Sequence, residues 1–191
     1  QEIKEVIEKT TFSYVRQREM LGLGHAILTG ETLIGHEPFA VVLADDLCTH
    51  ENKGVISQLI DVYNKYQCSI IAIEEVPESQ INQYGIVSGK LIQGTDDTYL
   101  VSDMIEKPSP SDAPSNLAII GRYILTPSIF DIIRNTKPGK LGEIQITDAL
   151  LVQAKKEKVI AYKFKGSRFD CGSINGYLEA TNHFARLQGI I

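Results

Sequence analysis

Unbroken apolar runs and helical patterns alternate over the first part of the chain. Residues 39–43 (FAVVL) and 69–76 (SIIAIEEV) lack the polar alternation of half-exposed strands, so we expect both to be buried strands, the first of them inside a sheet. Between them, residues 55–66 (VISQLIDVYNKY) carry apolar side chains at three- and four-residue steps, which predicts an amphipathic helix. This alternation of strand and helix indicates an α/β fold built on parallel strands.

The pattern changes beyond Pro77, where strand-like segments follow one another without long helices between them. Residues 84–92, 98–108 and 116–125 are of this kind, and the sequences GTDD and PSPSDAPS separate them. We interpret this part as a strand-rich insertion or a sheet edge. The remaining predicted elements are helices over 1–9, 25–33, 127–135, 146–158 and 174–187, and strands over 12–16 and 159–166.

The composition is that of an ordinary globular protein and limits the partners it could have. The 191 residues contain no repeat and no long linker, so residues 1–191 are predicted to form a single domain. The net charge of −5, the scattered lysines and the lack of Trp give no basic face for nucleic acid. One lysine and a divalent cation would still suffice to bind a small phosphorylated ligand.

The sequence also bears on location and on cysteine chemistry. No run approaches the roughly 18 apolar residues of a membrane span, and the charged start is not typical of a signal peptide, so we expect a cytoplasmic protein without a membrane partner. The three cysteines are an odd number without CxxC spacing, which argues against a disulfide framework or a zinc site. The four histidines likewise lack the spacing of metal ligands.

Two adjacent carboxylates follow the first buried strand. Asp45 and Asp46 fall where this strand leaves the sheet, and in open α/β sheets ligands collect at the carboxyl ends of the strands. Position alone favours a loop or capping role for Asp46, because Asp is common in turns. Asp45 is a candidate metal or phosphate-site ligand whose assignment depends on the rest of the chain.

Four short motifs at predicted strand ends or turns are candidates for chemistry. Each is weak by itself, since the EKP of IEKP can be a solvated charged turn and the FDCG of FDCGS an Asp turn closed by glycine. Their order along one α/β chain is more informative. The motifs are LADD (43–46), YG (84–85), IEKP (105–108) and FDCGS (169–173).

Together with RQREMLGLGHA (16–26), SNLAIIGRYIL (115–125) and GEIQITDAL (142–150), this ordered set closely resembles the bacterial UTP–glucose-1-phosphate uridylyltransferases. The resemblance covers essentially the whole chain. It implies the sugar nucleotidyltransferase fold, a Rossmann-like α/β fold with a mixed, mostly parallel sheet flanked by helices. It also implies the synthesis of UDP-glucose and pyrophosphate from UTP and glucose 1-phosphate.

The resemblance assigns residues to the two ends of the nucleotide sugar. Gln17 and the backbone at Gly22 would read the uracil edges, which suits an amide that both donates and accepts. Gly85 would let the backbone approach the glucose ring, and Gly121 would line the sugar pocket. Glu106 would accept hydrogen bonds from the sugar hydroxyls.

The resemblance also assigns the charged groups of the reaction. Lys107 would hold the sugar phosphate as a point charge, and Asp45 and Asp170 would hold Mg²⁺. Magnesium takes one or two carboxylates together with substrate phosphates, which suits two aspartates from distant strand ends. Asp46 is left out of this metal shell because other members can carry an apolar residue there. Glu143 belongs to the resembling segment but receives no role.

A bend is required at Glu106 and Lys107 if both are to flank one ligand, because adjacent strand residues face opposite sides. Pro108 favours an extended Lys107 before the chain leaves the strand.

The beginning of the family pattern is missing from the 191 residues. The family starts with a strand and a glycine-rich loop, G-x-G-T-R followed by a proline and a lysine, which wraps the triphosphate. The chain therefore resembles the C-terminal two-thirds of the family domain without its N-terminal strands, and we expect it to be inactive alone and prone to associate. Family members commonly form homo-oligomers, so a dimer or tetramer is expected.

Three other functions fit parts of the sequence. A thymidylyltransferase of the same superfamily would share most motifs, although GLGHA favours UTP. A metal-dependent glycosyltransferase would also use a strand-end Asp, but ADD lacks the usual D-x-D spacing. A non-catalytic nucleotide-sugar-binding module would fit the missing loop.

Overall fold

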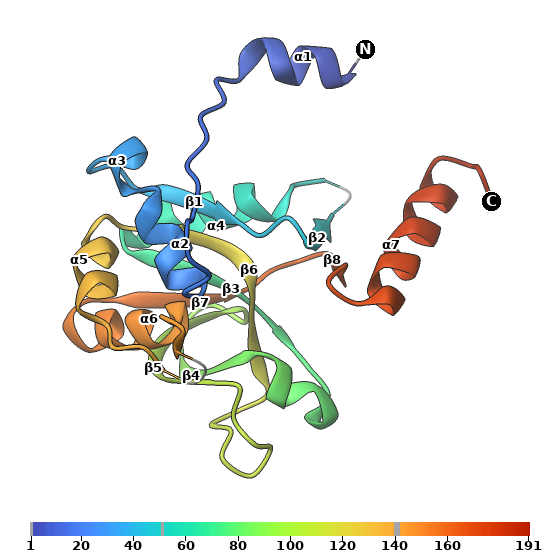
Figure 1. Cartoon of the computed structure of the whole chain (residues 1–191). Helices are drawn as coiled ribbons and strands as arrows, with labels where there is room; N and C mark the ends of the chain where they lie inside the picture. Colours follow the sequence, from blue (N-terminus) through green and yellow to red (C-terminus); the bar gives the residue numbers. More distant parts are fainter. Residues whose placement is uncertain (1, 51, 140–141) are drawn as a thin grey trace.

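A mixed six-stranded sheet forms the centre of the molecule, with helices on both faces (Figure 1). The computed structural model describes residues 2–50, 52–139 and 142–191. The strand order is β1-β6-β3-β7-β5-β4, and a separate two-stranded sheet pairs β2 with β8. The strands are β1 (Phe39–Val42), β2 (Asp46–Thr49), β3 (Ser69–Glu75), β4 (Gly85–Leu91), β5 (Thr98–Glu106), β6 (Leu117–Leu125), β7 (Val159–Lys163) and β8 (Ser167–Asp170).

The helices divide between the two faces of the sheet and two extensions. α2, α5 and α6 pack with one face in a core that includes Phe130 and Leu150, while α4 covers the other face through Val55 and Leu59. α1 and α7 extend away from the sheet at the two ends of the chain (Figure 1). The helices are α1 (Glu2–Lys9), α2 (Leu23–Thr29), α3 (Glu31–Ile34), α4 (Val55–Tyr66), α5 (Ser128–Asn135), α6 (Ile146–Lys156) and α7 (Ile174–Leu187), with a 3₁₀ helix over Glu78–Gln83.

The α/β class and the helical patterns predicted from the sequence are confirmed. α4 and α7 have the predicted bounds, and the strand-rich middle of the chain forms β4, β5 and β6. The N-terminal helix was predicted to include residue 1, which lies outside the described residues. No helix of the described part is long and apolar enough to cross a membrane.

The sheet is less parallel than predicted. Among the described pairs only β3 and β7 run parallel, because β6 enters between β1 and β3 and runs antiparallel to both. β6 follows the antiparallel pair β4–β5, which fixes its direction. It is a central strand with all nine residues buried. The interpretation of this part as a sheet edge holds only for the end of β4 beyond Val87, because Ile86 and Val87 pair with β6 as well as with β5.

Two local expectations are wrong. β1 was expected inside the sheet, but within the described residues it pairs with β6 alone, and Val42 is half exposed. Residues 12–16 were expected to be a strand, but they form an exposed connection between α1 and α2. An apolar run shows that a segment can pair, but it does not say whether a partner strand lies beside it.

Candidate active site

A cavity of about 430 Å³ opens where the turn after β1, the end of β5 and the start of α6 meet. Seven of the eight site residues predicted from the sequence line it, although they come from six separate parts of the chain. They are Gly22, Asp45, Gly85, Glu106, Lys107, Gly121 and Asp170. The sequence motifs that were weak one by one therefore converge on one cavity.

Asp45 and Asp170 are brought together by the small β2–β8 sheet. The backbone N–H of Cys171 donates to the Asp45 carbonyl at 2.7 Å, and Asp46 pairs with Asp170 in the strand register. A Cβ placed on Gly172 would lie 3.5 Å from Asp45 Oδ2 and 3.1 Å from Asp170 Oδ1. One point is therefore close to an oxygen of each carboxylate. Two nearby carboxylates at an open edge fit a hard divalent cation that also takes phosphate oxygens.

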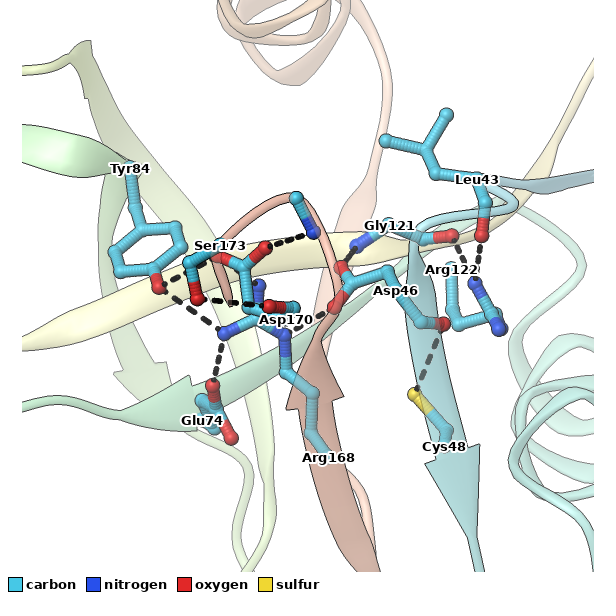
Figure 2. A network of polar contacts seen from close by, with 11 residues as sticks. Leu43, Asp46, Cys48, Glu74, Tyr84, Gly121, Arg122, Arg168, Asp170 and Ser173 are labelled. Atoms are coloured by element: carbon cyan, nitrogen blue, oxygen red, sulfur yellow. Dashed lines mark hydrogen bonds and ion pairs between the residues drawn. The ribbon is translucent and has the colours of Figure 1, made fainter. Parts of the chain in front are cut away.

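Asp46 has a different environment from its neighbour. Its side chain is buried, where Oδ2 accepts a hydrogen bond from the Gly121 N–H at 2.6 Å and Oδ1 accepts one from the Arg168 Nε (Figure 2). The loop or capping role that position favoured is wrong, because Asp46 begins β2 and is held in a buried ion pair. With both oxygens occupied, Asp46 stays outside the predicted metal shell.

Arg168 connects the acidic groups at this edge, and the sequence reasoning missed it. Its guanidinium donates to Glu74 at 2.8 Å and to the Tyr84 hydroxyl at 3.2 Å, and it lies 3.5 Å from Asp170 Oδ2 (Figure 2). The Tyr84 hydroxyl in turn donates to Asp170 at 3.3 Å. The one available signal was spacing, since Arg168 and Asp170 are two residues apart on a strand and so share a face.

The charges of this cluster shift one another's pKa values. Burial alone would lower the pKa of Arg168, but hydrogen bonds to Tyr84 and Asp46 and the charges of Asp46 and Glu74 outweigh burial and raise it. Burial raises the pKa of Glu74, and the adjacent Arg168 partly opposes this rise. Arg168 is therefore a permanent cation inside a cluster of carboxylates.

The bend required at Glu106 and Lys107 is present. β5 ends at Glu106, and Lys107 has a φ of 45°, in the left-handed region that residues with a Cβ rarely adopt. The extended Lys107 expected from Pro108 is therefore wrong. A hydrogen bond of 3.0 Å from the Lys107 N–H to the Tyr84 carbonyl holds this conformation, and the side chains of Glu106 and Lys107 both line the cavity.

Close packing of neighbouring side chains explains the two glycines Gly85 and Gly121 in the cavity lining. A Cβ on Gly85 would lie 2.7 Å from Thr147 Oγ1 and 3.0 Å from Glu106 Oε2. A Cβ on Gly121 would lie 2.7 Å from the Leu43 Cβ. Neither position has room for a side chain.

The segment around Gly22 also contributes to the cavity lining. Hydrogen bonds between Ile144 and the backbone of Leu21 and Gly24 clamp this segment to the start of α6. Gln17 is not among the cavity-lining residues. Its Nε2 lies 3.2 Å from the Gly22 carbonyl and 2.9 Å from the His25 Nδ1, so its reading of uracil stays a prediction.

Comparison with known proteins places this chain in a family. The sequence matches the nucleotidyl transferase family over residues 1–186, and the chain belongs to that family. It is 62% identical over 181 residues to a UTP–glucose-1-phosphate uridylyltransferase of Pseudomonas aeruginosa, covering 94% of this chain and 64% of that protein. The chain thus spans just under two thirds of this relative's length, and the resemblance read from the motifs is confirmed.

Solved structures agree with this placement. The crystal structure of a UDP-glucose pyrophosphorylase complexed with UDP-glucose matches with a TM-score of 0.93 and 59% identity, covering 96% of this chain and 69% of that one. A structure described as a Bacillus anthracis glucose-1-phosphate thymidylyltransferase matches with a TM-score of 0.74 and 21% identity, over 95% of this chain and 68% of that one. This second likeness concerns the fold alone.

Proposed function

We propose that the protein catalyses the uridylyltransferase reaction, in which UTP and glucose 1-phosphate give UDP-glucose and pyrophosphate. The observation that carries the proposal is the convergence of seven motif residues on one cavity, in a chain 62% identical to an enzyme of that name. Residues 1–191 would form a single domain, corresponding to the C-terminal two-thirds of the family domain.

The reaction is an in-line displacement at phosphorus. An oxygen of glucose 1-phosphate forms a bond to the α-phosphorus of UTP, and the bond to the pyrophosphate oxygen breaks. A phosphate monoester is already a nucleophile, so positioning and charge neutralisation supply most of the catalysis. Lys107 is exposed at the cavity, and no ion pair to a described residue engages its ammonium group, so it can hold the attacking phosphate.

Asp45 and Asp170 would hold Mg²⁺. Enzymes of this family are generally metal-dependent, and the two carboxylate oxygens near Gly172 suit magnesium as ligands. When bound, the cation would neutralise phosphate charge during the displacement. Arg168 supports this role because its guanidinium lies 3.5 Å from Oδ2 of Asp170 and holds that side of the carboxylate.

The sugar and the base would occupy opposite ends of the cavity. Glu106 would accept hydrogen bonds from glucose hydroxyls, with Gly85 and Gly121 lining the ring. Gly22 and the adjacent Gln17 would contact uracil.

Calorimetric titration of the folded chain tests the proposal. We expect binding of UDP-glucose in the presence of Mg²⁺, and much weaker binding of UDP-N-acetylglucosamine, which carries a bulkier substituent. Circular dichroism on the same sample confirms the fold. A folded chain that binds neither compound contradicts the proposed function.

We further propose that the protein works in the cytoplasm, where UTP and sugar phosphates are available, and that it forms homo-oligomers. α7 packs on the body through Phe169, whose ring centroid lies 4.9 Å from that of His183. The other side of α7 leaves Ile174 82% exposed and Tyr177 61% exposed. Such an apolar face on a projecting helix favours association with a second copy. Light scattering on the purified protein would give a mass above 21.2 kDa if this is correct.

A further inference from the structure

We propose that Thr147 is a positioning residue for sugar recognition: its hydroxyl occupies one oxygen of the Glu106 carboxylate and thereby directs the other oxygen at the glucose hydroxyls. The inference rests on the proposed function, since it requires Glu106 to contact the sugar. Thr147 has no role in the motif assignments above.

The contact itself is short and protected. Thr147 is in the first turn of α6 and only 3% exposed, and its Oγ1 donates to Glu106 Oε2 at 2.7 Å. A hydroxyl that donates to a carboxylate makes a charge-assisted hydrogen bond, which is stronger than one between neutral groups. The positive end of the α6 dipole adds to the attraction for the Glu106 charge.

The second carboxylate oxygen is left for a ligand. Glu106 Oε1 accepts no hydrogen bond from the residues that the structure describes, and Glu106 lines the cavity. A carboxylate rotates about its last bond when nothing holds it. Because Thr147 holds Oε2, this rotation is restrained and Oε1 keeps one direction.

Gly85 completes the arrangement from the facing strand. It lies opposite Glu106 in the β4–β5 register, and the space of a Cβ at Gly85 is already filled by the Thr147 hydroxyl and Glu106 Oε2. A side chain at Gly85 would displace the Thr147–Glu106 pair. The motifs YG, EKP and GEIQITDAL are thus coupled through this pair.

The test compares a ligand that has glucose with one that lacks it. Thr147→Val keeps the shape and removes the hydroxyl. We expect it to weaken UDP-glucose binding about tenfold or more, which at 1.4 kcal/mol per tenfold is within the range of a hydrogen bond to a charged group. Binding of UDP should change less than about twofold, and Thr147→Ser should restore most of the UDP-glucose affinity.

Thr98→Val is the matched control. The Thr98 hydroxyl is also buried and also donates to a carboxylate, Asp97 Oδ1 at 2.8 Å, but it lies at the other end of β5 outside the cavity lining. This variant should leave the ratio of UDP-glucose to UDP affinity unchanged. If the valine variant does not fold, Thr147→Ala, which also removes the hydroxyl, decides the question by the same comparison of UDP-glucose with UDP.

The possible outcomes separate the two proposals. A Thr147→Val protein that binds UDP-glucose like the wild type, or loses UDP and UDP-glucose alike, overturns the positioning role while the proposed function stands. A folded wild-type chain that does not bind UDP-glucose overturns the proposed function, and the inference with it.

Discussion

Arg168 is the single residue whose removal should most disturb the acidic edge of the cavity. Its side chain and that of Asp46 are each 8% exposed, and Glu74 and Asp170 lie on its other sides. Removing one partner of a buried ion pair leaves the other charge without compensation, which is more damaging than never having had the pair.

Arg168→Met should therefore lower the free energy of unfolding by about 3–5 kcal/mol at pH 7, measured by urea denaturation. Burial raises the pKa of Glu74 and Arg168 opposes this rise, so without Arg168 the pKa of Glu74 would lie further above its unfolded value. Protonation of Glu74 would then favour the folded state. The loss of unfolding free energy caused by Arg168→Met should therefore become smaller as the pH falls from 7 to 5. Arg134→Met, which breaks exposed pairs with Glu31 and Asp131, should leave the free energy of unfolding nearly unchanged at either pH. A loss of unfolding free energy that is the same at pH 7 and pH 5 would contradict this explanation.

Lys107 differs from Arg168 because its charge is exposed and available. Lys107→Met keeps the apolar stem and removes the ammonium group, so the affinity for glucose 1-phosphate should fall at least about tenfold with the circular dichroism spectrum unchanged. Lys90→Met, an exposed lysine on β4 outside the cavity lining, is the control. Equal affinities in the two variants would remove Lys107 from the phosphate site.

At the scale of elements, α4 shows how directly periodicity reports burial. Leu59 is fully buried against the sheet, whereas the adjacent Ile60 is 43% exposed. Leu59→Ala should lower the free energy of unfolding by about 2–5 kcal/mol through lost burial and a cavity. Ile60→Ala should cost much less, and urea denaturation of the two variants makes the comparison. Similar losses would mean that the helix is rotated from the position described.

Local sequence patterns predicted several helices and strands but not how the strands pair. The apolar spacing in α4 is a local pattern, so the helix could be predicted from the sequence. The apolar runs that form β3 and β6 are local too, and these strands could be predicted in the same way. The antiparallel insertion of β6 between β1 and β3 depends on which strands meet, which no local pattern records. β2 and β8 were missed because four polar-rich residues each carry little pattern.

At the scale of the whole molecule, the site was predictable where motifs exist and not where single contacts form. Asp45, Glu106 and Lys107 belong to short ordered motifs, and all three line the cavity. Arg168 contacts Asp46 across 122 residues, and Thr147 contacts Glu106 across 41, and neither contact leaves a trace in the local sequence.

The proposed cation site depends on two distant segments and can be tested by metal removal. Mg²⁺ should increase the thermal stabilisation that UDP-glucose gives the protein, and excess EDTA should abolish that increase. In Asp45→Asn, Mg²⁺ should no longer add to the thermal stabilisation by UDP-glucose, and electron paramagnetic resonance should show weaker Mn²⁺ binding. Asp96→Asn, which changes an exposed residue, should behave like the wild type. Retained Mn²⁺ affinity in Asp45→Asn would exclude this residue as a ligand.

The pairing of Asp46 with Asp170 has a further consequence, for the order of events during folding. β2 and β8 join segments from the first quarter and the last fifth of the chain, and such contacts form slowly because a long loop must close first. The helices and the β4–β5 hairpin need only short loops. A refolding chain should therefore regain its helices and the β4–β5 hairpin while it is still unable to hold the proposed cation, and cation binding would appear late in folding.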